Sequence, residues 1–138
     1  MMGILSSNAV GWILRQAGLC PFSLDTDMFQ IVREGENYIV HTDRLPEIYL
    51  EKVVTLDLFE YREELGVVWF AMDKVNARRT PVVVFYGEVE DAISFRVCLS
   101  PESPESLSDN LNGCFITIEQ AIEAFGHACE MGVKLLEE

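Results

Sequence analysis

The sequence predicts an α+β fold, in which helices pack on one face of a five-stranded, mainly antiparallel sheet. Three observations support this prediction. Three segments repeat apolar residues at helical spacing, and five shorter segments are β-prone runs bounded by turn residues. The segments follow the order α-β-β-β-α-β-β-α, with consecutive strands joined by turns, as in antiparallel meanders. The chain has 138 residues, of which 49% are hydrophobic, enough for one self-sufficient core.

The first elements are a short helix and a β-hairpin. Gly18 stands where a left-handed C-terminal cap of the helix belongs, and Pro21 lies just beyond it. Two β-prone runs, 28–33 and 37–42, then flank a turn that contains Gly35. The apolar stripe of the helix comprises Val10, Ile13, Leu14 and Ala17.

A third strand and a long helix form the middle of the chain. Residues 48–56 alternate in side-chain character after a break at Pro46. Asp57 and Glu60 resemble a capping box and predict that the helix begins there, and Thr80 marks its end. The apolar stripe of this helix comprises Tyr61, Leu65, Val68, Met72 and Val75.

Two strands and a helix complete the predicted fold. Residues 82–86 are apolar on both faces, which predicts a central strand, and residues 92–99 alternate most clearly of all. The segment Ser100–Gly113 contains two prolines and several small polar residues, so we expect a surface loop or a short helical turn. Thr117 and Gln120 then form a second capping box, from which a helix runs almost to the end of the chain.

The charge of the chain argues against one class of partner, and its cysteines favour one compartment. Asp and Glu number 23 against 10 Lys and Arg, a net charge of −13, which would repel the phosphates of nucleic acids. No stretch approaches the roughly 20 apolar residues of a spanning helix, and the N-terminal segment makes a poor secretory signal. The cysteines, which are Cys20, Cys98, Cys114 and Cys129, form no Cys-x-x-Cys pair. We therefore expect reduced thiols in a cytoplasmic protein whose residues 1–138 form a single domain.

Three local features, taken with the order of the elements, point to a family resemblance. They are the opening helix, the hairpin Asp27–Thr42, and Val75-Asn76 at the end of the middle helix, before the hairpin Val82–Leu99. In these features the chain resembles the type III secretion chaperone-like fold and, within it, the bacterial YbjN-like family of sensory transduction regulators, over nearly its whole length. The resemblance implies a small, non-enzymatic cytoplasmic protein that is often a homodimer. True chaperones of this fold bind an extended segment of a secreted partner.

The middle helix carries a second apolar set, Val67, Phe70 and Ala71, which its core stripe does not need. Either another element of the same chain covers this set, or the set forms the interface of a homodimer, usually an isologous one. Trp69 lies one residue from the stripe, and we expect its ring in the core.

Three tyrosines, Tyr38, Tyr49 and Tyr86, fall in predicted strands. On an uncovered face of the sheet they would offer flat, amphipathic contact area to a partner peptide. The alternative is that they pack across neighbouring strands while water solvates their hydroxyl groups.

No arrangement of residues in the sequence indicates catalysis, a cofactor or a metal. Glu119, Glu123 and His127 repeat at four-residue spacing and could hold a divalent metal, but a solvated acidic face is the simpler interpretation. His41 and Asp43 form a short pair without the third, orienting group that a general base needs. The sequence has neither a glycine-rich phosphate loop nor a nucleophile-elbow motif. We therefore assign no catalytic, cofactor-binding or metal-binding residue.

The leading functional hypothesis is a non-catalytic protein-interaction module, chaperone-like or regulatory, that binds a protein partner or peptide segment. We expect a homodimer that binds neither nucleic acid nor membranes. The acidic surface would steer basic or amphipathic segments towards the protein. Two alternatives stay open. One is a small-ligand-binding or enzymatic α+β domain with a pocket between sheet and helices, and the other is an acidic inhibitor or immunity-type protein.

Overall fold

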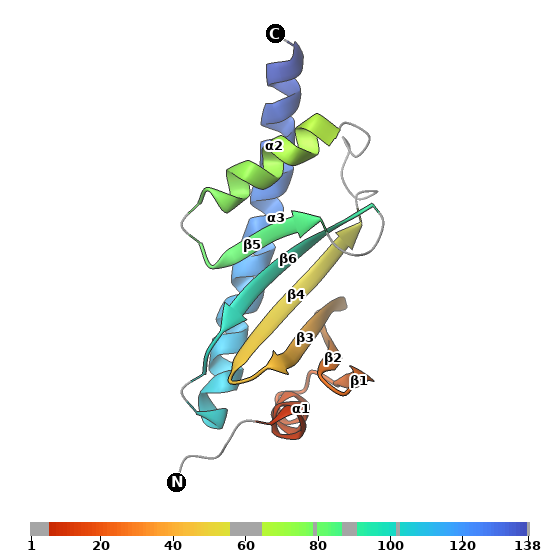
Figure 1. Ribbon diagram of the computed structural model, residues 1–138, viewed down its shortest axis with the longest axis vertical. Coiled ribbons are helices and arrows are strands. Elements are labelled where there is room, and N and C mark those ends of the chain that lie inside the picture. Colours follow the sequence, from red (N-terminus) through yellow and green to blue (C-terminus); the bar gives the residue numbers. More distant parts are fainter. Residues whose placement is uncertain (1–5, 56–64, 79, 87–90, 102, 138) are drawn as a thin grey trace. The chain divides into compact units, whose positions relative to one another are not determined.

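The computed structural model describes residues 6–55, 65–78, 80–86, 91–101 and 103–137 (Figure 1). This described part contains three α-helices and six strands. The helices are α1 (Ser7–Gln16), α2 (Leu65–Asn76) and α3 (Leu107–Glu137), and a short 3-10 helix, η2 (Pro104–Ser106), precedes α3. The strands are β1 (Phe22–Asp25), β2 (Met28–Arg33), β3 (Glu36–Arg44), β4 (Glu47–Thr55), β5 (Val82–Tyr86) and β6 (Ala92–Leu99).

The six strands form one sheet in the order β1-β2-β3-β4-β6-β5. The predicted α+β class is confirmed, but the sheet has six strands where the sequence predicts five. The additional strand, β1, pairs antiparallel with β2 and places Phe22 opposite Gln30 and Ser23 opposite Phe29. Because β1 is only four residues long, its alternation is too short to stand out in the sequence.

The chain divides into two compact units, which we describe separately. Unit 1 comprises Met1–Lys52 and Val97–Phe115, and unit 2 comprises Val53–Arg96 and Ile116–Glu138. Each unit thus combines segments that are distant in the sequence. The expectation that residues 1–138 form a single domain stays a prediction.

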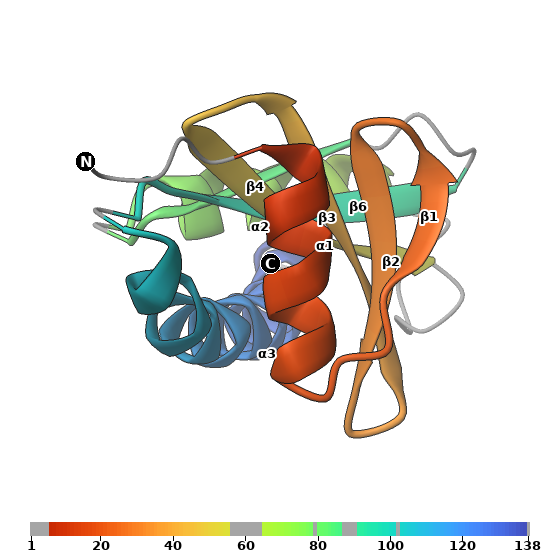
Figure 2. The same cartoon turned by 90° about the horizontal axis from the view of Figure 1, so that it is seen from below.

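In unit 1, helices pack on one face of the sheet. A Cβ atom on Gly11 would lie 3.1 Å from the ring of Phe29, so α1 approaches β2 closely at this point (Figure 2). Phe115 of α3 packs edge-on against Tyr38 of β3, with ring centroids 4.8 Å apart. Phe29 lies opposite Val40, which is two residues from Tyr38 and therefore on the same face. Both helices consequently contact the same face of these strands, as the sequence predicts.

α3 begins at Leu107 and not at Thr117, so the predicted loop Ser100–Gly113 is wrong over its second half. The first turn is fixed by Ser103 and Ser106, each of which accepts a hydrogen bond from the other's backbone N–H at 3.3 Å. The capping pattern at Thr117 lies inside the helix, because a buried stripe runs through it without interruption. That stripe comprises Leu107, Leu111, Phe115 and Ile118.

In unit 2, α3 packs on β6, where Phe95 meets Phe125 edge-on with ring centroids 5.8 Å apart. The predicted capping box of the middle helix, Asp57 and Glu60, lies outside the described residues. The described part of this helix, α2, ends at Asn76.

β5 has the predicted bounds but not the predicted position, because it is an edge strand and not a central one. Val82 and Val84 are buried, whereas Val83 between them is 57% exposed. α2 contacts β5 (Figure 1). This helix buries apolar side chains of β5, as neighbouring elements do for a central strand. An apolar run therefore identifies a covered strand but not its place in the sheet.

Candidate functional site

The three residues predicted to form a dimer interface differ in burial, and Phe70 is only partly buried. Val67 and Ala71 are buried. A Cβ atom on Gly132 of α3 would lie 3.0 Å from Cδ1 of Phe70 and 3.4 Å from Cγ1 of Val67. Packing of α2 on α3 therefore covers Val67 and part of Phe70. A dimer interface formed by Val67, Phe70 and Ala71 stays a prediction. The homodimer itself stays a prediction.

Trp69, which the sequence places in the core, is 53% exposed. Its ring is tilted against that of Tyr86 on β5, with centroids 5.1 Å apart. The Tyr86 hydroxyl is buried and has no hydrogen-bond partner among the described residues. Burial raises the pKa of Tyr86, and the negative charge of Asp91 raises it further. Tyr86 thus supports an exposed aromatic ring, but its own hydroxyl is not presented to solvent.

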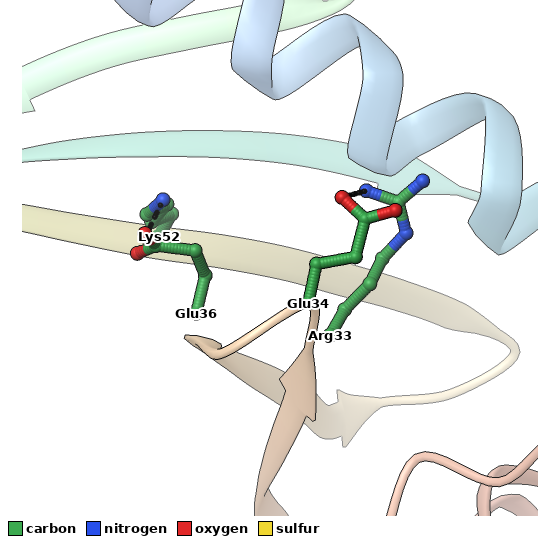
Figure 3. Close-up of polar contacts among 4 residues, drawn as sticks. All are labelled: Arg33, Glu34, Glu36 and Lys52. Carbon is green, nitrogen blue, oxygen red and sulfur yellow. Dashed lines mark ion pairs between the residues drawn. The ribbon is translucent and has the colours of Figure 1, made fainter.

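Tyr38 belongs to the core of unit 1 and not to a partner-binding surface. It is completely buried, with Phe115 against its edge and the Lys52 Nζ atom 5.2 Å from its ring centroid. Lys52 also pairs with Glu36 at 3.0 Å, and Arg33 lies 3.8 Å from Glu34 in the adjacent turn (Figure 3). The alternation of β3 places Tyr38 on the helix-covered face, where it packs against Phe115 of α3. It therefore packs internally as the alternative expects, but its hydroxyl is buried and not solvated.

Tyr49 lies on the opposite face of the sheet and is half-buried. Its hydroxyl donates a hydrogen bond to Glu47 at 3.2 Å. This hydrogen bond is the main reason why the pKa of Tyr49 is raised, and the neighbouring thiol of Cys98 adds to the effect. Of the three predicted tyrosines, Tyr49 is the one on the face of unit 1 opposite to the helices, and it is partly exposed there.

Three apolar side chains at the β1 end of unit 1 are exposed, and we call them the open patch: Phe22, Leu24 and Val32. Their exposed fractions are 66%, 44% and 42%. Phe22 lies opposite Gln30, which is two residues from Val32, so Phe22 and Val32 share the face that the helices leave uncovered. Leu24 is the residue that a bulge between Ser23 and Asp25 leaves without a partner in the register.

β1 is also one edge of the sheet, because its neighbour in the strand order is β2 alone. All four of its residues are exposed. An edge strand presents backbone N–H and C=O groups that can pair with another strand. Carboxylates border it, because Asp25 ends the strand and Asp27 follows, where it accepts a hydrogen bond from Ser7 at 3.1 Å. This edge therefore combines an outer side that no described strand pairs with, apolar side chains and negative charge.

The other edge strand, β5 in unit 2, is capped by a side chain. The Asn76 side chain donates from Nδ2 to the Val84 carbonyl oxygen and accepts from the Val84 N–H at Oδ1, both at 2.8 Å. The amide thus occupies both backbone groups of Val84 as a residue of a neighbouring strand would. The sequence indicates Val75-Asn76 only as a family feature, and it gives no sign of this capping role.

A largely buried pair, His41 and Glu51, lies next to Tyr49, on the face of the β3–β4 pair opposite to Tyr38. The His41 Nε2 atom is 2.6 Å from Glu51 Oε1, and both side chains are largely buried. The sequence suggests Asp43 as the neighbour of His41, but the pairing of β3 with β4 brings Glu51 within reach and Asp43 is exposed. The pair satisfies a buried carboxylate, and we assign no reaction to it.

The other predicted polar cluster is solvated. His127 lies 3.8 Å from Glu123 and 3.9 Å from Glu130, and all three side chains are mostly exposed. Within the described ranges no three His, Cys, Asp or Glu side chains are grouped so that they could hold a metal ion. In the same ranges, every helix is too short or too polar to cross a membrane.

Comparisons with known proteins show the fold. No protein-family model matches the chain, and a search of curated proteins finds no match. Among solved structures, the chain is similar to the crystal structure of YbjN from E. coli, described as a putative transcription regulator. The two share 12% sequence identity with a TM-score of 0.59, over 94% of this chain and 92% of the other. This chain therefore has a YbjN-like fold.

Proposed function

We propose that this protein is a non-catalytic interaction module that binds an extended segment of a protein partner along the free edge of β1. The observation that carries the proposal is the open patch, because Phe22 alone is 66% exposed on a strand that no described strand pairs with on its outer side. Large exposed apolar groups that lie together usually mark an interaction site. A bound segment would extend the sheet by one strand and lay alternate side chains beside Phe22.

The charge of the protein defines the kind of segment. With a net charge of −13 and carboxylates at Asp25 and Asp27, the edge favours a partner with lysine or arginine between its apolar residues. Such a segment alternates apolar and basic side chains at strand spacing. The apolar residues would contact the open patch, and the basic residues would lie near the acidic rim.

The difference between the two edges supports this assignment. Exposed edges invite unwanted pairing, and proteins usually block them. The Asn76 amide occupies the β5 edge. The β1 edge is short, has a bulge and ends in Asp25, but it carries neither lysine nor proline within Phe22–Asp25. This difference between the two edges supports the proposal that β1 serves as a docking strand.

The similarity to a protein described as a transcription regulator agrees with a non-enzymatic role. Since the net charge disfavours direct contact with nucleic acid, a regulatory role would act through a protein partner. We also propose a reducing, cytoplasmic location. All four cysteines are free, and Cys20 and Cys98 are exposed.

A selection from a random peptide display library tests this function. We expect enriched sequences that alternate apolar and basic residues. Burying the exposed 66% of a side chain of about 200 Å² at about 25 cal/mol per Å² gives about 3 kcal/mol for Phe22. Phe22→Asp should therefore weaken the selected peptide at least tenfold. Trp12→Asp is the matched control, because Trp12 is 62% exposed on α1 and should leave the affinity unchanged.

N-methylation of the bound peptide's backbone provides a second test of the proposal. In strand addition, alternate amides of the peptide bond to β1, so N-methylation of one alternating set should abolish binding while methylation of the other set is tolerated. The proposal fails if selection enriches nothing, if Phe22→Asp and Trp12→Asp act alike, or if both methylated peptides bind equally well.

A further inference from the structure

An exposed aromatic pair in unit 2 has no part in the proposed function. Trp69 of α2 is 53% exposed, and its ring lies against that of Tyr86 on β5 with centroids 5.1 Å apart. Gly66 precedes Trp69 by one helical turn, and no described atom lies within 4 Å of the position that a Cβ atom would take there. Because side chains on a helix lean over the preceding turn, open space adjoins the indole ring.

Carboxylates flank this aromatic pair. Asp73 follows Trp69 by four residues, so the two side chains are neighbours on one face of α2. Asp73 is exposed and makes no ion pair with a described residue. Burial raises the pKa of the Tyr86 hydroxyl, and the negative charge of nearby Asp91 raises it further. Each of the two rings therefore has a carboxylate close to it.

The basic side chains of the chain are directed to other rings. In the described part, four rings lie under a basic side chain: Arg33 over Phe115, Lys52 over Tyr38, Lys74 over Phe70 and Arg96 over Phe85. Trp69 has no such cation among the described residues, although an indole attracts a cation more strongly than the other aromatic rings. Lys74 directly follows Asp73 in the sequence, but its Nζ atom lies 5.5 Å from the ring centroid of Phe70. A cation from another molecule can therefore reach Trp69 and Asp73.

Trp12 shows that exposure alone does not produce this arrangement. Trp12 is 62% exposed on α1 and makes no ring contact with another described residue. Its neighbours four residues away are Asn8 and Gln16, and Arg15 lies three residues away. Trp12 thus has uncharged and basic neighbours, whereas Trp69 has a supporting ring and a carboxylate.

The chemistry of the aromatic pair fits a guanidinium group best. This group is planar, stacks on aromatic rings and is more weakly hydrated than an ammonium, and its N–H donors match a carboxylate. Free arginine would also bring its own carboxylate towards Asp73 and Asp91, which would repel it. We infer that Trp69 and Tyr86 bind an arginine side chain of a polypeptide partner, with Asp73 as the carboxylate that pairs with the guanidinium.

The competing explanation is that Trp69 only shields Tyr86 and the apolar side chains of β5 from water. That role needs no carboxylate, and it predicts that Trp69 and Trp12 respond alike to a cation. A net charge of −13 attracts cations weakly to the whole surface. Saturable binding at Trp69 alone therefore distinguishes a site from this general attraction.

NMR titration at constant ionic strength separates the two explanations, because the chain has two tryptophans whose indole N–H groups give separate signals. The probes are arginine and citrulline with acetylated N-termini and amidated C-termini, which have nearly the same shape but differ in charge. We expect blocked arginine to shift the Trp69 signal saturably at millimolar concentrations. Trp12 should show no saturable shift, and blocked citrulline should not bind. Blocked arginine should bind more tightly than free arginine.

Variants of exposed residues locate the site. Asp73→Asn should weaken binding of blocked arginine about two- to fivefold, the range for an exposed ion pair. Asp43→Asn removes the same charge from an exposed residue of β3 and should have no effect. Trp69→Leu, followed at the amide of Asp73, should weaken binding about fivefold or more. Phe22→Asp should leave it unchanged, so this inference and the proposed function can fail separately.

Four results would overturn the inference. The first is a shift of the Trp69 signal that grows linearly with blocked arginine or matches that of Trp12. The second is equal binding of blocked citrulline. The third is an affinity that neither Asp73→Asn nor Trp69→Leu lowers. The fourth is tighter binding of free arginine, which would contradict a polypeptide as the source of the guanidinium.

Discussion

Replacing Asn76 by alanine tests the structural reason for the difference between the two edges of the sheet. The substitution removes two hydrogen bonds, both 2.8 Å long, from the backbone of Val84. At about 1 kcal/mol net for each hydrogen bond, the free energy of unfolding should fall by about 2 kcal/mol. The loss would be larger if water cannot reach the freed groups, since Val84 is buried.

Asn76→Asp separates the two bonds. An aspartate can still accept a hydrogen bond from the Val84 N–H, but it cannot donate to the Val84 carbonyl oxygen. Its charge also lies at the C-terminal end of α2, where the helix dipole is negative. We therefore expect Asn76→Asp to be at least as destabilising as Asn76→Ala.

Urea denaturation followed by circular dichroism measures these changes. Asn112→Ala is the control, because Asn112 is an exposed residue of α3, and its free energy of unfolding should stay within about 0.5 kcal/mol of the wild type. For a chain of this size, a loss of about 2 kcal/mol lowers Tm by roughly 6–10 °C. With the β5 edge uncapped, Asn76→Ala should also self-associate at high concentration. The reasoning is refuted if Asn76→Ala is as stable as the control.

Three further predictions concern packing and reactivity. Gly132→Ala should lower the free energy of unfolding by about 1–3 kcal/mol, because the added methyl group would clash with α2. Gly126→Ala, which has open space around it, should raise the free energy of unfolding by up to about 1 kcal/mol. Thermal melts that rank the two variants in the opposite order would contradict the packing of α2 on α3. Leu107→Ala should lower the free energy of unfolding, measured by chemical denaturation, by about 2–5 kcal/mol, because Leu107 is fully buried. An unchanged free energy of unfolding would instead support the loop that the sequence predicts there. Burial raises the pKa of Cys129 to about 11. Iodoacetamide at pH 8 should therefore label the exposed Cys98 and should label Cys129 only after the protein is denatured. Equal labelling of the two cysteines in the folded protein would contradict the burial of Cys129.

The raised pKa of Cys129 also gives a pH dependence with a definite sign. The folded state holds the thiol proton up to about pH 11, whereas the unfolded chain releases it near its ordinary value of 9.0. This contribution to stability is therefore present below pH 9 and is lost as the pH rises from 9 to 11. The loss should be absent in Cys129→Ala.

Elements with long, uninterrupted patterns were predictable from the sequence. The bounds of β6 follow from local alternation, because side chains on a strand repeat every second residue. Those of β2 and β5 follow from β-prone runs between turn residues. The beginning of α3 was not predictable in the same way. Pro101 and Pro104 indicate a loop, and the buried contacts of Leu107 and Leu111 outweigh that local signal.

The candidate site depends on information that local patterns lack. Which face of β3 is covered decides the role of Tyr38, and a shift of one residue would exchange the two faces. Phe22 is exposed because β1 lies at the edge, a property of the strand order and not of its own four residues. The capping role of Asn76 likewise requires that β5 be an edge strand, whereas its apolar composition suggests a central one.

Hydrogen exchange at the backbone of β1 tests the central claim most directly. The amides of Phe22–Asp25 should exchange quickly in the free protein, because the strand is exposed and lies at the edge. Adding a saturating amount of the selected peptide should slow exchange of alternate amides in Phe22–Asp25. Protection confined to α2 or α3, with β1 exchanging as fast as before, would contradict the claim that the free edge of β1 binds the partner.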